Sequence, residues 1–167
     1  MDSRALEVIN ALKLQPHPEG GWFRELFRSA AAVQPADGRP SRSALTTIYF
    51  LLEYGRNSRW HRVLSDEAWV HLEGAPLDLW EWDDAKNIAT CTALGPMNFQ
   101  SDIKAQHVVP AGIWQAARPQ QVPHQGYTLV SCSVGPGFDF ADFSMMQRSG
   151  PEASRIHRDW PELANLI

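Results

Sequence analysis

His61 and Glu67 are the residues of this chain best suited to acid–base chemistry. They lie six positions apart among residues that favour strands. Buried ionisable groups need partners and often mark a functional site, although a hydrogen-bonded structural pair is the alternative. In a dry pocket, a histidine and a carboxylate can remove a proton next to a carbonyl group and return it. The pair therefore predicts proton-transfer catalysis on a small molecule.

The alternation of side chains along a strand indicates which neighbours would share that pocket. Residues two apart face the same side, so an inward Glu67 brings Trp69 and His71 with it. The opposite phase places Val70 and Leu72 inside, which hydrophobicity alone favours, and the sequence leaves both open. If Glu67 faces inward, Trp69 and His71 are candidate ligand-binding residues.

Trp114 and Gln115 begin a second short run with strand character. An inward Gln115 sends Trp114 to the other face, and the small residues that follow suit a pocket wall. We expect Gln115 to form a hydrogen bond with a ligand, and Trp69 or Trp114 to stack on it.

Arg24 and Arg28 follow Trp22 and Phe23 on another expected strand. They could form a solvated face with cross-strand charge pairs. An arginine that points inward would instead bind a carboxylate or phosphate through its planar fork. Both are therefore candidate anchors for a negative group, whereas His17, between two prolines, is expected to pack or to cap a turn.

From Trp22 onward, short runs of β-branched and aromatic residues alternate with turn residues. The expected strands are Trp22–Arg28, Ala44–Leu52, Trp69–Leu72, Leu77–Trp82 and Tyr127–Val134. Many short strands predict a barrel or a sandwich. A short helix capped by Ser3 should precede them, and a helical segment should begin at Pro151. The small, polar segment Ala30–Ser41 is expected to be a mobile loop.

Composition narrows the class of protein. The chain has 167 residues, 44% of them hydrophobic, which suits one domain over residues 1–167. A net charge of −4 without a basic stripe argues against nucleic acid as a partner. The first residues lack the apolar run of a signal peptide or membrane span, so we expect a cytoplasmic protein with no membrane partner. Cys91 and Cys132 are expected to be buried, reduced thiols.

Several motifs resemble the cupin superfamily. The first cupin motif has the spacing of Gly55, His61, Val63, Glu67 and Gly74, and the second that of Pro110, Gly112 and Gln115. One branch of the superfamily, long filed as a cupin-like domain of unknown function (DUF985), is similar over more of the chain. That similarity rests on four segments in order, HPEGGWFRE at 17–25, TTIYFLL at 46–52, WHRVLSDE at 60–67 and PAGIWQ at 110–115.

The resemblance implies an all-β double-stranded β-helix, the cupin jelly-roll barrel, commonly assembled as a homodimer. Metal-dependent cupins hold one divalent ion with two histidines, a glutamate and a later histidine. Here Val63 and Gln115 stand at two of those positions. The remaining set of His61, Glu67 and Gln115 is a poor metal site, because a glutamine carbonyl is a weak neutral donor.

Three functions remain open at this point. The first is a small-molecule-binding cupin that works as a metal-independent isomerase or epimerase on a sugar-like or carbonyl-containing ligand, with His61 and Glu67 as the catalytic pair. The second is an oxygenase or isomerase with a weakly held divalent metal at His61, Glu67 and Gln115. The third is a non-catalytic ligand-binding or sensor domain that uses the same pocket.

Overall fold

The computed structural model describes residues 2–97, 101–123 and 125–167. Its strands are almost all antiparallel, as the sequence predicts. In chain order the elements are α1 (Ser3–Leu12), β1 (Gln15–Pro16), β2 (Trp22–Arg28), β3 (Ala32–Val33), β4 (Arg42–Ser43), β5 (Thr46–Glu53), β6 (Ser58–Val63), β7 (Asp66–Gly74), β8 (Leu77–Asp83), β9 (Ile88–Leu94), β10 (Gln106–Val109), β11 (Trp114–Pro119), β12 (Tyr127–Gly135), η1 (Phe140–Asp142), β13 (Phe143–Met145), α2 (Pro151–Asp159) and η2 (Pro161–Leu166).

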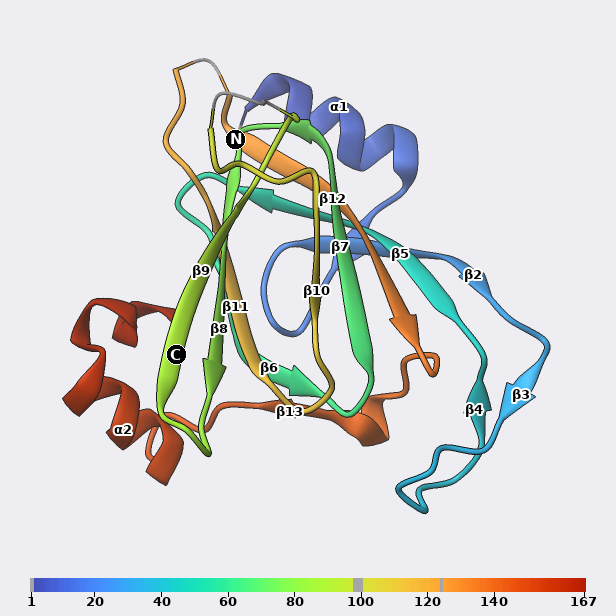
Figure 1. Ribbon diagram of the computed structural model, residues 1–167. Helices are drawn as coiled ribbons and strands as arrows, with labels where there is room; N and C mark the ends of the chain where they lie inside the picture. The colour runs from blue at the N-terminus through green and yellow to red at the C-terminus, as the bar shows by residue number, and fades with distance from the viewer. Residues whose placement is uncertain (1, 98–100, 124) are drawn as a thin grey trace.

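Two sheets face each other and curve into a barrel (Figure 1). The first has the strand order β1-β2-β5-β12-β7-β10, and the second has the order β13-β6-β11-β8-β9. Neighbours such as β5 and β12 are far apart in the sequence yet pair over eight positions, from Thr46↔Val134 to Glu53↔Tyr127. This wrapping places the ends of distant strands around one interior, as a double-stranded β-helix requires.

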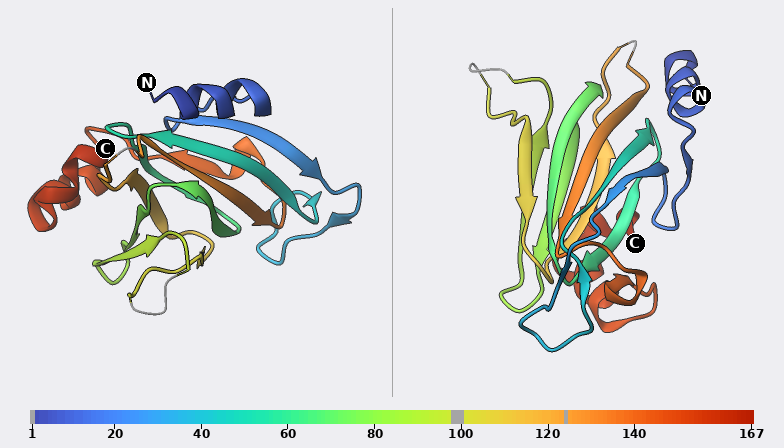
Figure 2. Two further views of the ribbon diagram at one scale, coloured as in Figure 1. Left: turned by 90° about the horizontal axis from the view of Figure 1, so that it is seen from above. Right: turned by 90° about the vertical axis from the view of Figure 1, so that its right-hand side faces the viewer.

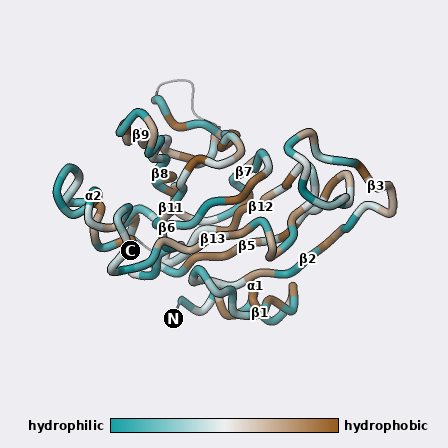
Figure 3. Tube along the Cα trace, turned by 90° about the horizontal axis from the view of Figure 1, so that it is seen from below, coloured by the Kyte–Doolittle hydropathy of each residue, from teal (hydrophilic) through white to brown (hydrophobic). Residues whose placement is uncertain are grey.

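Hydrophobic side chains form three packed regions rather than one. Between the sheets lies the inner core, built around Phe50, Trp69, Leu79 and Val130. Strands β5 and β12, which contribute to it, carry hydrophobic stretches in Figure 3. Outside the second sheet lies the outer core, defined by Trp60, Trp82, Trp114, Met146, Ile156, Leu163 and Leu166. A third region joins α1 to the outer face of the first sheet.

The helices cover the outside of the barrel (Figure 2). Asp2 caps α1, since its Oδ1 accepts hydrogen bonds from the backbone N–H groups of Arg4 and Ala5. The expectation that Ser3 is the cap was therefore wrong by one residue. Pro151 takes the first position of α2, as predicted, because its missing N–H is not needed there.

The segment 30–41 is not a plain loop. Ala32–Val33 pairs with Arg42–Ser43 as a short hairpin. The Arg39 and Arg42 side chains reach the buried Asp142 carboxylate at 2.7 and 2.8 Å. These ion pairs fix the hairpin to the turn that precedes β13.

Two further findings concern burial. Cys132 is buried as expected, but Cys91 is exposed, because it lies on β9, an edge strand of the second sheet. No helix in the described ranges has the length and apolar character needed to cross a membrane.

Candidate functional site

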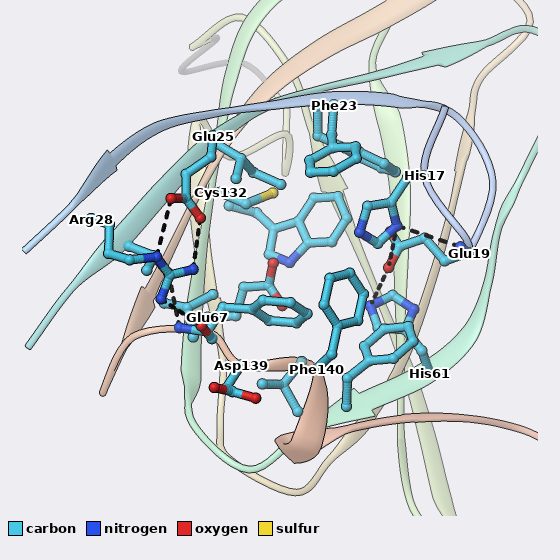
Figure 4. Close-up of a pocket in the computed structure, with 18 residues that line it drawn as sticks. His17, Glu19, Phe23, Glu25, Arg28, His61, Glu67, Cys132, Asp139 and Phe140 are labelled. Carbon is cyan, nitrogen blue, oxygen red and sulfur yellow. Dashed lines mark hydrogen bonds and ion pairs between the residues drawn. The ribbon is translucent and has the colours of Figure 1, made fainter. Parts of the chain in front are cut away.

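A cavity of about 250 Å³ opens between the two sheets (Figure 4). Its walls are mostly aromatic and aliphatic, and its polar groups lie at two ends. The lining residues are His17, Glu19, Phe23, Glu25, Arg28, Thr46, Ile48, Phe50, His61, Val63, Glu67, Trp69, Cys132, Val134, Phe138, Asp139, Phe140 and Phe143.

His61 reaches the cavity from the centre of β6. Its side chain is 2% exposed, and its neighbour on the same face is Val63. Nδ1 lies 2.7 Å from the carbonyl oxygen of Arg59, which can only accept, so Nδ1 carries the proton. In the neutral ring Nε2 is therefore an unprotonated acceptor. Burial lowers the pKa of His61, which favours this neutral form.

Glu19 faces that acceptor nitrogen. The sequence analysis did not identify Glu19 as a site residue. Its Oε2 lies 3.2 Å from Nε2 of His61, and its Oε1 accepts a hydrogen bond of 2.8 Å from the Ser58 hydroxyl. The residue is 5% exposed, and burial raises the pKa of its carboxyl group. A charged carboxylate beside an unprotonated nitrogen would set two lone pairs against each other. We therefore conclude that Glu19 and His61 hold one proton between them.

His17 completes this end of the cavity. The backbone N–H of Glu19 donates to its Nδ1 at 3.4 Å, and the same Nδ1 lies 3.5 Å from Glu19 Oε2. Burial lowers the pKa of His17 as well, so its ring is also neutral. A proton on Glu19 thus has two imidazole nitrogens as acceptors. The packing role expected for His17 is also present, because its ring meets that of Phe23 edge-on at 4.6 Å.

A tight turn brings His17 and Glu19 to this position. Gly20 and Gly21 have φ angles of 113° and 71°, which side chains other than glycine rarely adopt. A Cβ atom on Gly20 would lie 2.3 Å from the backbone oxygen of Asn57. The signal in the sequence was therefore the segment HPEGG at 17–21, whose paired glycines allow the close approach to β6.

Glu67, Gln115 and Trp69 form a hydrogen-bonded chain across the interior. The indole Nε1 of Trp69 only donates, and it lies 3.0 Å from Oε1 of Gln115. This fixes the amide, so its Nε2 donates to Glu67 Oε2 at 2.6 Å. Burial raises the pKa of Glu67, while the hydrogen bond from Gln115 opposes the rise. Gln115 thus joins β11 of the second sheet to β7 of the first, behind the cavity wall.

These donors do not fit a resident metal. Both polar atoms of the Gln115 amide are used by Trp69 and Glu67. His61 directs its free nitrogen at Glu19, and Val63 offers no donor. Within the described ranges, no group of three or more histidine, cysteine, aspartate or glutamate side chains is placed to hold an ion. A metal needs several free donors converging on one point, and here they are committed to one another.

Arg28 is the candidate anchor that lines the cavity, but its nitrogens are already engaged. Nε and Nη2 bond the two carboxylate oxygens of Glu25 at 3.1 and 2.7 Å, and Nη1 bonds the Phe138 carbonyl at 3.0 Å. Arg24 lies outside, where it donates to the Leu12 carbonyl at 3.0 Å. Arg28 therefore keeps only two of its five N–H groups free, and Arg24 does not line the cavity.

His71 and Trp114 do not line the cavity. On β7 the inward phase is the one with Glu67 and Trp69, which are 7% and 1% exposed, whereas Leu72 is 45% exposed. The register of β7 against β12 shifts just after His71, whose Nε2 contacts the Ala75 carbonyl. Trp114 faces the outer core, with the Arg62 guanidinium 4.6 Å above its ring.

An aromatic wall near the mouth was also absent from the predicted set. Phe138, Phe140 and Phe143 have ring centroids within 5.0 to 6.0 Å of one another. The wall is held in place by the bond from Arg28 to Phe138 and by the ion pairs of Asp142. The sequence signal was weak, because Asp139 and Asp142 resemble ordinary turn residues.

Comparison with known proteins places the chain in a family. The family described as "Cupin superfamily (DUF985)" matches residues 6–146. An uncharacterized protein of Saccharomyces cerevisiae, YML079W, is 26% identical over 84% of this chain and 74% of its own length. A hypothetical protein from Leishmania major superposes with a TM-score of 0.82 and 31% identity, over 100% of this chain and 97% of that one. Oxalate decarboxylase from Bacillus subtilis shares the fold, with a TM-score of 0.56 and 12% identity over 91% of this chain and 36% of that one.

Proposed function

This chain belongs to the DUF985 family of the cupin superfamily, and on that premise we propose that it is a small-molecule-binding cupin that works as a metal-independent isomerase or epimerase. In the proposed reaction, a base in the cavity removes a proton from a carbon next to a carbonyl group. The electron pair of the C–H bond forms an enolate, and a proton returned to the same or a neighbouring atom gives the isomer. No electron acceptor or other co-reactant is needed.

The observation that carries this proposal is the 3.2 Å contact between Glu19 Oε2 and His61 Nε2 at the wall of a largely apolar cavity, from which we infer a shared proton. Glu67 lines the same cavity as a second carboxyl group. We assign His61 and Glu67 as the catalytic acid–base pair, and Glu19 as the positioning residue that keeps a proton at His61. Burial raises the pKa of both glutamates and lowers that of His61, so the uncharged form of each group is favoured.

The size of the cavity restricts the substrate. At about 250 Å³ it lies just below the range of roughly 300–1,000 Å³ that is common for drug-sized ligands. A single sugar ring or a carbonyl compound of similar size suits it. Trp69 and Phe50, whose rings meet at right angles, offer apolar surface for such a ring.

Proton exchange with solvent tests the proposal before any product is known. The chain is incubated in D₂O with a panel of aldoses, ketoses and their amino-substituted analogues, with EDTA present, and proton NMR follows the loss of each C–H signal. We expect exchange on at least one compound, and a fall of about 10²- to 10⁴-fold in His61→Asn and in Glu67→Gln. His107→Asn is the matched control, because His107 pairs with Glu81 outside the cavity.

The variant Glu19→Gln tests whether Glu19 positions a proton at His61 or only fills space in the core. Glutamine keeps the volume but carries no acidic proton, so the exchange rate should fall and the pH–rate profile should lose one of its limbs. An unchanged profile would remove Glu19 from the mechanism. Saturable binding without exchange across the panel would favour the ligand-binding or sensor domain. Exchange that appears only in a parallel incubation without EDTA would restore the metal-dependent alternative.

We also expect a cytoplasmic homodimer of single-domain chains. Between Arg24 and Arg28, β2 pairs with β5 on one side, and β1 reaches only Trp22 and Phe23 on the other. A free sheet edge of this kind can accept a strand from a second copy. Sedimentation velocity tests the assembly, since a monomer at micromolar concentration would contradict it.

A further inference from the structure

The cavity has two polar ends of different chemistry, separated by aromatic rings (Figure 4). One end holds the proton-sharing pair of Glu19 and His61. The other holds Glu25, Arg28 and Asp139 near the aromatic wall of Phe138, Phe140 and Phe143. The charges at this second end determine which ligands the proposed site can accept.

Negative charge exceeds positive charge at the second end. The Glu25 carboxylate holds Arg28 through two hydrogen bonds, so this pair is neutral as a unit. Asp139 adds a further negative charge and forms no salt bridge with any residue that the structure describes. The hydrogen bonds to Glu25, then the charges of Glu25 and Asp139, raise the pKa of Arg28. Arg42 also interacts with the charge of Asp139, but its guanidinium is paired with Asp142 and does not line the cavity, so the lining at this end has two acids and one base.

Aromatic rings adjoin this negative end. Phe140 is 57% exposed although it lines the cavity, so its ring meets whatever enters. The rings of Phe138 and Phe143 lie 5.0 and 6.0 Å from it. The face of an aromatic ring attracts cations within about 6 Å of its centroid, most strongly where water is excluded. Phenylalanine rings beside a carboxylate that caps η1 but forms no salt bridge among the described residues make a suitable site for an organic cation.

We propose that the cavity selects compact ligands that carry an ammonium or amidinium group, and that it rejects those with a phosphate or a free carboxylate. The positive group lies against Asp139 and the aromatic wall, and the rest of the ligand reaches the His61 end. This inference rests on the proposed function for the location of the site, and it narrows the substrate to amino-substituted sugars or carbonyl compounds.

Three flat compounds of nearly equal size test the selection. Benzamidine, benzamide and benzoate differ mainly in charge, being positive, neutral and negative at pH 7.5, and isothermal titration calorimetry at low salt gives their dissociation constants. Benzamidine should bind about tenfold more tightly than benzamide, and benzoate should bind most weakly. Equal affinity for benzamidine and benzamide, a preference for benzoate, or no binding by any of the three would overturn the proposal.

Two charge-removing variants assign the selection to its residues. Asp139→Asn retains the cap of η1, because asparagine caps as well as aspartate, and it should abolish most of the preference for benzamidine. Glu25→Gln releases Arg28 and should tighten benzoate about tenfold. Glu162→Gln, an exposed position on η2, makes the same change in net charge and should leave the three affinities unchanged. Equal changes of affinity in all three variants would show that the net charge of the protein alone determines the preference, which contradicts the proposal.

The binding measurements and the exchange assay fail independently. If benzamidine binds most tightly of the three and no compound exchanges its proton, the proposed selection for cations stands and the isomerase proposal fails. If exchange occurs and benzoate is the preferred probe, the isomerase proposal stands and the selection fails.

Discussion

Trp69 and Trp114 show how differently the two main cores are built. Both side chains are almost fully buried, at 1% and 3% exposure. In the inner core, the Trp69 indole donates to Gln115, which in turn donates to Glu67. In and around the outer core, Trp60 and Trp82 donate to Leu163 and Asn87, but the Nε1 atoms of three other tryptophans are buried without a hydrogen-bond partner among the described residues: Trp80, Trp114 and Trp160.

This contrast separates two roles. Leaving a buried donor unpaired costs roughly 1–3 kcal/mol, so the outer core must gain its stability from the large apolar area of its rings. The inner core instead satisfies its polar groups and directs them at a cavity. We conclude that the C-terminal helices and the outer core stabilise the barrel, while the inner core borders the cavity in which we place the proposed reaction.

The largest expected effect comes from the outer core. Trp82 is completely buried there, and the Arg155 guanidinium lies 5.0 Å from its ring. Trp82→Ala should lower the free energy of unfolding by about 3–5 kcal/mol, because it removes a large buried ring and leaves a void. Urea denaturation measures the loss. Under conditions where the variant is still folded, its affinity for benzamidine should stay within about twofold of the wild-type value. A large loss of binding would show that the two cores are energetically coupled.

A smaller effect is expected from the polar chain of the inner core. Gln115→Leu keeps a similar volume but leaves the Trp69 N–H and the Glu67 carboxyl without their partner. The free energy of unfolding should fall by about 2–4 kcal/mol, since two buried polar groups lose a hydrogen bond. Gln115→Glu, which restores an acceptor for Trp69, should recover part of the loss. A neutral Gln115→Leu would mean that the chain contributes nothing to stability.

The smallest effect is a dependence on pH. Burial raises the pKa of Glu67 above its ordinary value of 4.5, so the folded chain keeps this proton at pH values where the unfolded chain releases it. The stability that Glu67 contributes is complete below pH 4.5 and is lost as the pH rises toward the folded pKa. Relative to Glu67→Gln, the wild type should therefore lose up to about 1.4 kcal/mol per pH unit above pH 4.5. Paired urea titrations from pH 4.5 to 8 check the sign, and a wild type that gains stability over this range would contradict a raised pKa.

Local sequence patterns were enough to predict much of the fold. Runs of β-branched and aromatic residues gave strands near their true bounds at Trp22–Arg28, Leu77–Asp83 and Tyr127–Gly135. Strand β6 was not among the expected strands, because two arginines interrupt the buried residues of its segment SRWHRV and weaken the strand pattern. Strand alternation did predict that an inward Gln115 sends Trp114 to the other face, since that geometry needs no distant contact.

The sequence alone was enough to predict the all-β class, and it offered an inward Glu67 and Trp69 as one of two open strand phases and His61 as a candidate site residue. The hydrogen-bond and ion-pair partners of these residues could be identified only from the tertiary structure. Glu19 meets His61 across 42 positions of the chain, and Arg28 meets Phe138 across 110. Local propensity reports on the neighbours of a residue, whereas hydrogen bonds between distant segments depend on how the whole barrel closes. Arg28, by contrast, is neutralised by Glu25, which lies only three residues away on the same strand, so that local pairing works against the anion-anchoring role expected of Arg28.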